Sequence, residues 1–453
     1  MVAFVKRASG LAIAAMIWAA PATSETLTDA FVAAYRDSGL IEQNRAVLRA
    51  ADEDVATAIT ALRPVLNYAA GINYSNPTLD DHLSASLSLN ASMLLYDFGR
   101  SQLGIDAAKE TVLATRAALV DVENTVFLNT VRSYLAVRRS QAFVELRENN
   151  VRLLSEQLRA TRDRFEVGEV TRTDVSLAEA RLAAARSGLA AEQGGLARAK
   201  EQYRAVVGRY PGSLAAPGRS PAIPSSEDSA RSVARQQNPQ VIQVQHQVKA
   251  VELIVQQAAR SVYPSLNATG RVSIDNDGDD TQSIGLELSG PIYSGGAISS
   301  GVRQAIAQRD QVRAQLHTTG LLVDQEVGNA YANLAVSIAS IDASQRQVKA
   351  ATLALEGVRE ELQLGARTKL DVLDQEQELL DAQTNLVAAE VDKVVAVYEV
   401  LDAMGHLTAE RLGLNVPIYD PAAYYNAVKD APDGVYSPQG KKLDRVLRAL
   451  GQE

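Results

Sequence analysis

Cysteine is absent from the 453 residues, histidine occurs only four times, and aromatic residues make up only 5% of the chain. The lack of thiols excludes disulfides, thiolate metal sites, cysteine catalysis and a lipid anchor on an N-terminal cysteine. The histidines are scattered over residues 82–406, so we expect no metal site and no cofactor. Ala, Gln, Arg and Glu dominate the long middle stretches, which predicts long helices rather than a large globular core.

An excess of positive charge is also missing, because 54 Asp and Glu residues outnumber 45 Lys and Arg residues and give a net charge of −9. Binding to nucleic-acid phosphates requires a basic surface, so we expect no nucleic-acid partner. The sequence contains no phosphate-binding loop and no convergent set of nucleophile, base and metal-ligating residues. These absences predict that the protein is not an enzyme.

Long apolar runs are missing beyond the N-terminus. Lys6 and Arg7 precede an apolar run over residues 8–20, and small residues follow up to Ser24. This order is typical of a secretory signal peptide, which we place at residues 1–24. The alternative is a membrane anchor, but about a dozen apolar residues are too few to cross a bilayer as a helix. No later segment has the roughly 20 apolar residues of a spanning helix, so any membrane insertion must use strands.

The chain does contain an internal repeat. Residues 165–175 return as residues 362–372, which is a spacing of 197 residues. Further pairs at nearly the same spacing are Tyr96 with Tyr293, Gly99 with Gly296, Tyr134 with Tyr331, and residues 63–67 with 263–267. Because this period is too long for a solenoid, the sequence predicts two copies of one supersecondary unit.

Each copy contains two segments in which apolar residues alternate with small or polar ones, the period of a β-strand. They lie at residues 65–75 and 83–93 in the first copy, and at 266–274 and 284–289 in the second. A soluble sheet with one buried face would show the same pattern. The membrane interpretation is favoured by the segment lengths, by the modest Leu, Ile and Ala side chains, and by tyrosines at the helix-proximal strand ends. These candidate interfacial girdle residues are Tyr96, Tyr263 and Tyr293.

Four strands cannot close a barrel, and an open sheet edge in lipid leaves backbone groups without partners. Protomers must therefore combine. Two protomers would give about eight strands, which leave room only for side chains, whereas three would give about twelve and enclose a passage. We therefore predict a homotrimer.

Proline is absent between Pro77 and Pro211 and again between Pro291 and Pro417, as long helices require. The run from Gly99 to the first tip would extend roughly 100 Å at 1.5 Å per residue. Each helix then turns back at a glycine. The glycine suits a left-handed C-cap, and a Thr-x-x-Asp pattern directly afterwards suits a capping box.

The predicted organisation therefore has two repeats between a leader and a tail, with shorter helices over residues 26–62 and 226–262 ahead of the strands. Its parts are a signal peptide at 1–24, a first repeat at 25–210 (membrane strands 65–95, long helices 99–207, tip 167–171), a linker at 211–225, a second repeat at 226–410 (membrane strands 264–293, long helices 296–407, tip 364–368) and a C-terminal periplasmic tail at 411–453.

The strand exits at residues 95–99 and 291–296, the duplicated tips and the leader together resemble the TolC family of outer-membrane efflux and secretion channels. The resemblance covers the mature chain up to about Leu407. It implies a mainly α-helical protein with a β-barrel part: a homotrimer whose twelve strands form an outer-membrane barrel that continues as a periplasmic α-helical barrel. Each repeat then combines a β-hairpin with a long antiparallel helical hairpin.

The same resemblance implies the function of a passive exit duct in the outer membrane lipid. Its partners would be a periplasmic membrane-fusion adaptor and an inner-membrane pump, either an ABC exporter of type I secretion or a proton-driven efflux pump. Without cysteine, the chain belongs with the non-lipidated members, where secretion channels tend to lie. The alternative function is a secreted coiled-coil scaffold or adhesin, with the helices as rods and the strands as a soluble cap.

Two acids at the second tip are candidates for a pore constriction. Asp371 and Asp374 lie three residues apart on one helix face. In a trimer they would place about six carboxylates around one opening, which favours cations. The resemblance assigns this role to them. The alternative is that both are solvated first-turn acids that satisfy the helix dipole.

The resemblance also implies a closed-state latch in which Arg367 binds Thr173 and Asp174. The chain departs from the family at Leu362, where other members have a tyrosine that bonds the same aspartate, so one contact of the latch is missing. The alternative for Arg367 is an exposed loop cation.

The tips are the expected contacts of the adaptor, since the resemblance implies that the two proteins meet end to end. The alternative is that these residues serve turn geometry alone. The candidates are Gly168, Thr171, Gly365 and Thr368.

Overall fold

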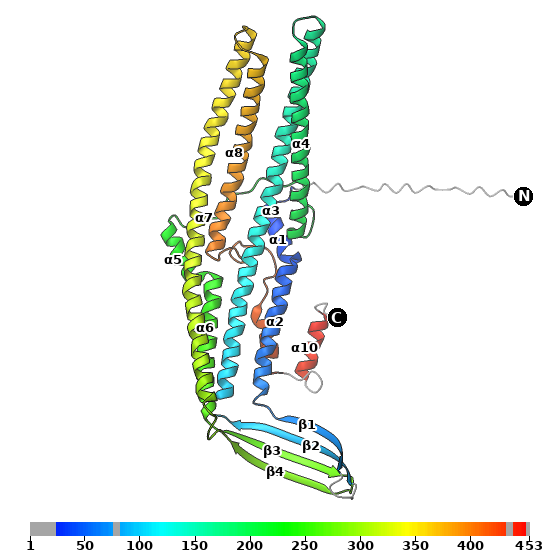
Figure 1. The fold of residues 1–453 in the computed structure, drawn as a ribbon, viewed down its shortest axis with the longest axis vertical. Helices are drawn as coiled ribbons and strands as arrows, with labels where there is room; N and C mark the ends of the chain where they lie inside the picture. The colour runs from blue at the N-terminus through cyan, green and yellow to red at the C-terminus, as the bar shows by residue number, and fades with distance from the viewer. Residues whose placement is uncertain (1–23, 76–81, 432–437, 450–453) are drawn as a thin grey trace, which may run out of the picture.

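The computed structural model describes residues 24–75, 82–431 and 438–449, so the predicted signal peptide, apart from Ser24, lies outside the described residues. The molecule is elongated, with a β-sheet at one end and the tips of two helical hairpins at the other (Figure 1). Among the described residues, no helix is both long enough and apolar enough to cross a bilayer.

The two repeats have the same order of elements. The first contains α1 (Leu27–Asp37), α2 (Gly39–Thr60), β1 (Val65–Ser75), β2 (His82–Tyr96), α3 (Arg100–Glu166) and α4 (Arg172–Val207). The second contains α5 (Glu227–Gln237), α6 (Pro239–Ala259), the 3-10 turn η1 (Arg260–Val262), β3 (Ser265–Asp275), β4 (Asp280–Ser289), α7 (Ala297–Gln363) and α8 (Lys369–Ala403). The tail adds α9 (Pro421–Val428), which packs against α2, and α10 (Pro438–Ala449).

The prediction of one helix ahead of each strand pair was too simple, because a cap interrupts each of them. Ser38 ends α1 and caps α2, and Asn238 ends α5 and caps α6 with an adjoining Pro239. Asn238 is buried, and its amide donates to the carbonyl of Ala403 at the end of α8. The break therefore serves a tertiary contact as well as a local cap.

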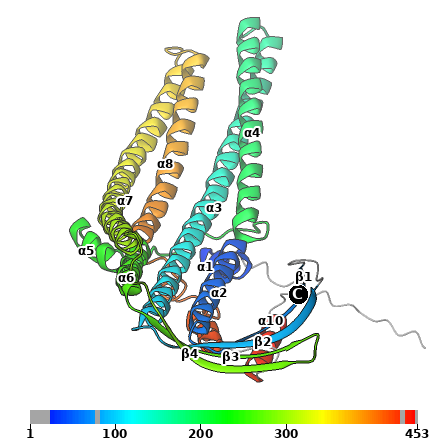
Figure 2. The same cartoon turned by 60° about the horizontal axis from the view of Figure 1, so that its bottom comes forward.

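The predicted long helices are present, since α3 and α7 each run for 67 residues. Their partners α4 and α8 return alongside them as antiparallel hairpins. Seen from the sheet end, the sheet curves beneath the helices, and both tips point away from it (Figure 2). The two hairpins therefore form one continuous extension of the sheet.

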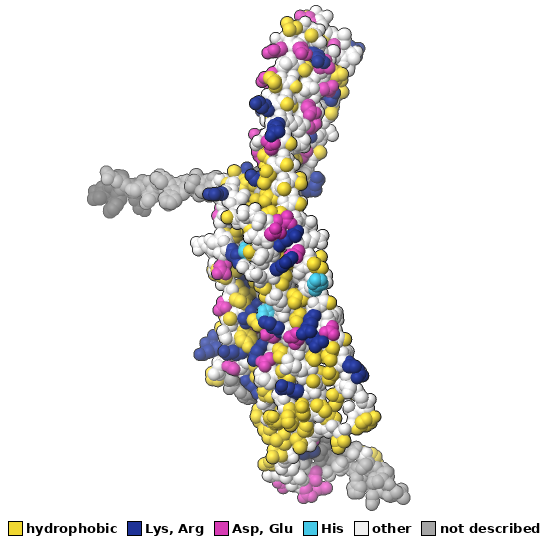
Figure 3. Space-filling model, turned by 90° about the vertical axis from the view of Figure 1, so that its left-hand side faces the viewer, with side chains coloured by type: hydrophobic (Ala, Val, Ile, Leu, Met, Phe, Trp, Pro, Cys, Tyr) yellow, Lys and Arg dark blue, Asp and Glu magenta, His cyan; other side chains and the backbone are white. Residues whose placement is uncertain are grey.

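The sheet is antiparallel with strand order β1-β2-β3-β4, so the outer edges of β1 and β4 have no partner strand among the described residues. Outward side chains are apolar and exposed: Ile72 is 79% exposed, Ile284 96% and Leu286 71%. Hydrophobic side chains gather at this end of the molecule, with acidic side chains beyond them (Figure 3). Strand β4 ends at Ser289, short of the predicted limit of 293, because Pro291 cannot donate to the ladder.

The predicted girdle tyrosines lie at the junction of sheet and helices. Phe98 links two of them, because its ring centroid lies 4.8 Å from that of Tyr96 and 4.9 Å from that of Tyr263. Tyr293 follows β4 and is 89% exposed. All three positions suit an interface between hydrocarbon and water.

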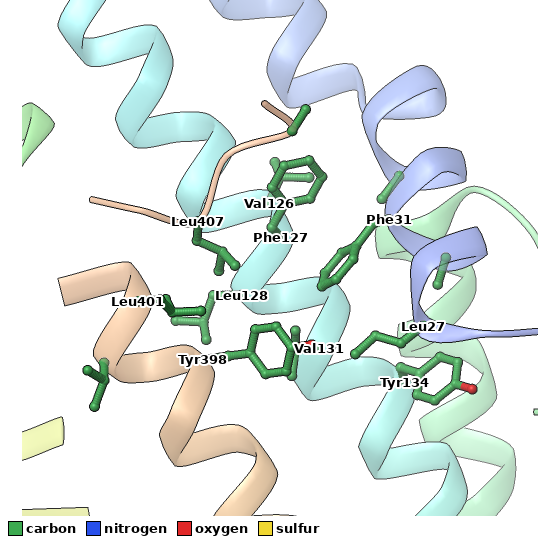
Figure 4. Packing of buried hydrophobic residues seen from close by; sticks show 14 of the residues in the cluster. Leu27, Phe31, Val126, Phe127, Leu128, Val131, Tyr134, Tyr398, Leu401 and Leu407 are labelled. Carbon is green, nitrogen blue, oxygen red and sulfur yellow. The ribbon is translucent and has the colours of Figure 1, made fainter. Parts of the chain in front are cut away.

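The largest core lies midway along the molecule and joins the repeats. Phe31 of α1, Phe127 of α3 and Tyr398 of α8 meet there, with Phe31 and Phe127 centroids 5.2 Å apart (Figure 4). The hydroxyl oxygen of buried Tyr134 lies within hydrogen-bond distance of two backbone carbonyl oxygens, 2.9 Å from that of Glu25 and 2.8 Å from that of Ala215. The core therefore also fixes the start of the described chain and the linker.

A polar cavity of about 350 Å³ lies between α3, α6, α7 and α8 at the same level. Asp121, Glu326 and Asp402 line it from three helices. Burial raises the pKa of Asp402 to about 7, and the neighbouring Asp121 and Glu326 carboxylates contribute. The unfolded aspartate ionises near pH 4, so this raised pKa lowers the stability of the fold progressively as the pH rises from about 4 to about 7.

Replacing the cavity acid tests this assignment. We expect Asp402→Asn to raise the melting temperature by about 2–4 °C at pH 8 and to change it little at pH 4, because the loss of stability develops between about pH 4 and pH 7. Circular dichroism melts at both pH values measure the difference. The matched control is Asp381→Asn, an exposed acid on the same helix, which should leave both melts unchanged. An equal effect of Asp402→Asn at the two pH values would contradict the assignment.

Candidate gating site at the helix tips

The two tips have the predicted backbone. Between α3 and α4, Gly168 adopts φ +77°, and between α7 and α8, Gly365 adopts φ +75°. A Cβ at either position would meet nothing within 4 Å, so the left-handed backbone is the reason for glycine there. Both candidate adaptor contacts are exposed at the end of the molecule.

Each returning helix starts with the predicted capping box. An Asp174 oxygen accepts from the Thr171 amide at 2.8 Å and from its hydroxyl at 2.7 Å. Asp371 accepts from the Thr368 amide and hydroxyl, both at 2.8 Å. These bonds hold the pKa of both carboxyls below the usual range, so both acids are charged at neutral pH.

The two candidate constriction acids have different partners. Asp371 is engaged by its cap, whereas Asp374 forms an ion pair with Arg181 of α4, at 2.7 Å between Nη2 and Oδ1. That pair joins the second hairpin to the first. No sequence pattern pointed to Arg181, because the contact depends on how the two hairpins lie against each other.

The predicted latch residues are not in contact within the protomer. Arg367 donates to Glu361 of its own hairpin at 2.8 Å, while Thr173 and Asp174 lie at the start of α4. Arg367 and Thr173 are exposed. The closed-state latch of Arg367 with Thr173 and Asp174 therefore stays a prediction.

Glu376 is a buried acid that sequence reasoning missed. It is 6% exposed and accepts from Gln157 of α3 at 2.8 and 3.0 Å and from Arg359 of α7 at 2.8 Å. One carboxylate therefore joins three helices and both hairpins. The available signal was its spacing, because Val372, Glu376 and Leu380 form a buried stripe at four-residue intervals.

Lysine at the start of α8 adds a further contact, since Lys369 Nζ lies 3.3 Å from the Thr161 hydroxyl of α3. Burial and Arg164 lower the pKa of Lys369. A pocket of about 180 Å³ lies here, lined by Asp174, Lys369 and Leu373 among others. We call the set of polar contacts between the hairpins the inter-hairpin bridge: Gln157, Thr161, Arg181, Lys369, Asp374 and Glu376.

The bridge contains charged and amide groups suited to ion pairs rather than to metal binding. Within the described part of the chain, no three His, Cys, Asp or Glu side chains are grouped so that they could hold a metal ion. Next to the bridge, Leu154 and Leu158 of α3 pack against Leu182 of α4, and Leu373 of α8 joins them. The tips thus meet through a small apolar contact and a larger polar one.

The sequence model of the family described as outer membrane efflux protein matches residues 36–209 and, separately, residues 230–406. The chain belongs to this family. Outer membrane efflux protein BepC of Brucella suis is 34% identical over 93% of this chain and 94% of its own length. Outer membrane protein TolC of Escherichia coli is 26% identical and covers 88% of this chain and 86% of its own.

Solved structures have the same fold. The CmeC outer membrane channel of Campylobacter jejuni superposes with a TM-score of 0.76 at 16% identity, over 91% of this chain and 90% of CmeC. CusC superposes with a TM-score of 0.75 at 20% identity, over 84% and 92%. The predicted fold class is confirmed by these structures. Family membership confirms that the protein is an outer-membrane efflux duct reaching into the periplasm.

Proposed function

We propose that three copies of this chain form a passive duct through the outer membrane and the periplasm. The observation that carries the proposal is the sheet, whose apolar side chains are exposed and whose outer strands β1 and β4 each have a single partner strand among the described residues. Three copies would supply about twelve strands, enough to enclose a passage. The helical hairpins would continue that passage away from the membrane.

An inner-membrane pump and a periplasmic adaptor would supply energy and cargo. Relatives carry names from two kinds of export: alkaline protease secretion protein AprF of Pseudomonas aeruginosa, 25% identical over 70% of this chain, and cation efflux system protein CusC of Escherichia coli, 24% identical over 71%. We propose that the adaptor docks on the exposed tips, at Gly168, Thr171, Gly365 and Thr368. The duct itself performs no catalysis.

The tips would form the gate. In the trimer Asp371 and Asp374 would surround the opening, and Arg367 would reach Thr173 and Asp174 of a neighbouring copy when it leaves Glu361. Within each copy the inter-hairpin bridge holds the hairpins together. Because these contacts are polar, they can exchange with water when the hairpins separate.

Planar-bilayer recording of the purified full-length protein tests the proposal. We expect discrete, cation-selective conductance steps, because carboxylates at the opening attract cations. Replacing both acids, Asp371→Ala with Asp374→Ala, should abolish the cation preference while pores still form. Absence of pores would contradict the duct, and retained selectivity would place these acids away from the lumen.

Removing the charge of Glu376 should weaken the closed gate. Glu376→Gln removes the charge that accepts from Gln157 of the other hairpin, at a cost of about 1–2 kcal/mol per protomer, which corresponds to about a five- to thirtyfold shift towards the open state. The occupancy of the high-conductance state in bilayers measures this shift.

The matched control is Glu378→Gln. Glu378 lies two residues away on the same helix and accepts from Gln347 of its own hairpin, at 3.1 Å. That variant should keep the wild-type occupancy. If the two variants behave alike, the bridge does not hold the gate.

A further inference from the structure

Asp374 forms an ion pair with Arg181, whereas no ion pair of Asp371 is present among the described residues. Arg181 and Asp374 come from different hairpins, and their side chains are 39% and 54% exposed, so water reaches the pair. Asp371 instead accepts from the neutral groups of Thr368. The two acids of the proposed constriction therefore differ: Asp374 is paired with a cation from across the joint, whereas Asp371 is held by its own cap, with the charge of Arg367 near enough to lower its pKa.

An exposed ion pair of this kind contributes little to stability. Its effect on the local field is larger, because a neutralised carboxylate attracts a passing cation far less than a bare one. The contact is broken only by moving the hairpins apart or by changing a residue.

The other cations near the tips have partners elsewhere. Arg162 pairs with Glu179 within the first hairpin, Arg367 donates to Glu361 within the second, and Lys369 contacts Thr161. Among the described ion pairs, Arg181 is the residue that binds a candidate constriction acid. It also lies on the same inter-hairpin joint as the buried Glu376 bridge.

We infer that Arg181 sets the charge of the constriction: it masks Asp374 while the hairpins are joined and exposes it when they part, so that preference for multivalent cations rises on opening. Arg181 is thus a specificity-determining residue, and its effect is exerted through Asp374. The inference rests on the proposed function, because it requires a lumen at the tips.

Arg181→Gln in the full-length protein tests it. In planar bilayers we expect the half-blocking concentration of hexamminecobalt(III) to fall about tenfold. The reversal potential in a salt gradient should also shift towards the equilibrium potential of the permeant cation. Adding Asp374→Asn to Arg181→Gln should restore the wild-type block, because the effect passes through that carboxylate. Arg162→Gln is the matched control and should leave the block unchanged, since its partner Glu179 lies in the same hairpin.

The outcomes separate this inference from the proposed function. Unchanged block in Arg181→Gln, or enhanced block that persists in the double variant, would overturn the role of Arg181 while leaving the duct intact. Failure of the wild-type protein to form pores would remove the duct, and with it the lumen that the inference requires.

Discussion

The unpaired edges of a four-stranded sheet constrain the whole molecule. In hydrocarbon each backbone group without a partner costs several kcal/mol, because no water can replace the missing hydrogen bond. Strands β1 and β4 each present such an edge together with exposed apolar side chains. A single protomer is therefore unsuited to a bilayer, and the proposed pairing with further copies would resolve the edges and create the passage at once.

The duplication that supplies four strands also supplies two long hairpins, and these are held together differently along their length. Midway, the aromatic contacts of Phe31, Phe127 and Tyr398 join the repeats in a dry core. At the tips the joint consists largely of polar contacts around Glu376, beside a small leucine cluster. Since polar contacts exchange with water at little net cost, the tips are the place where the hairpins can separate without unfolding the centre.

Local patterns predicted the parts of the structure that depend on neighbours in sequence. Period-two alternation indicated the strands, the absence of proline indicated helices of 67 residues, and Thr171 with Asp174 indicated a capping box that the structure contains. The breaks at Ser38 and Asn238 were missed, because Asn238 caps one helix while bonding another that is distant in sequence. The Arg181 and Glu376 contacts were missed for the same reason: they depend on the register of α8 against α3 and α4.

The repeat also fixes how protomers should meet. Residues 63–67 correspond to 263–267 and Tyr96 to Tyr293, so β4 of one copy and β1 of the next should pair as β2 and β3 do. Within the protomer Leu89 lies opposite Val272, which places Leu286 opposite Ile72 of the next copy.

The most direct measurement is disulfide formation in outer membranes by the double variant Ile72→Cys with Leu286→Cys, in a chain that has no other cysteine. Trimeric pairing predicts a ladder on non-reducing gels that ends at three protomers, whereas Leu66→Cys with Leu286→Cys, six residues out of register and so about 20 Å apart, should remain monomeric. A protein that stays monomeric in both cases would contradict the account.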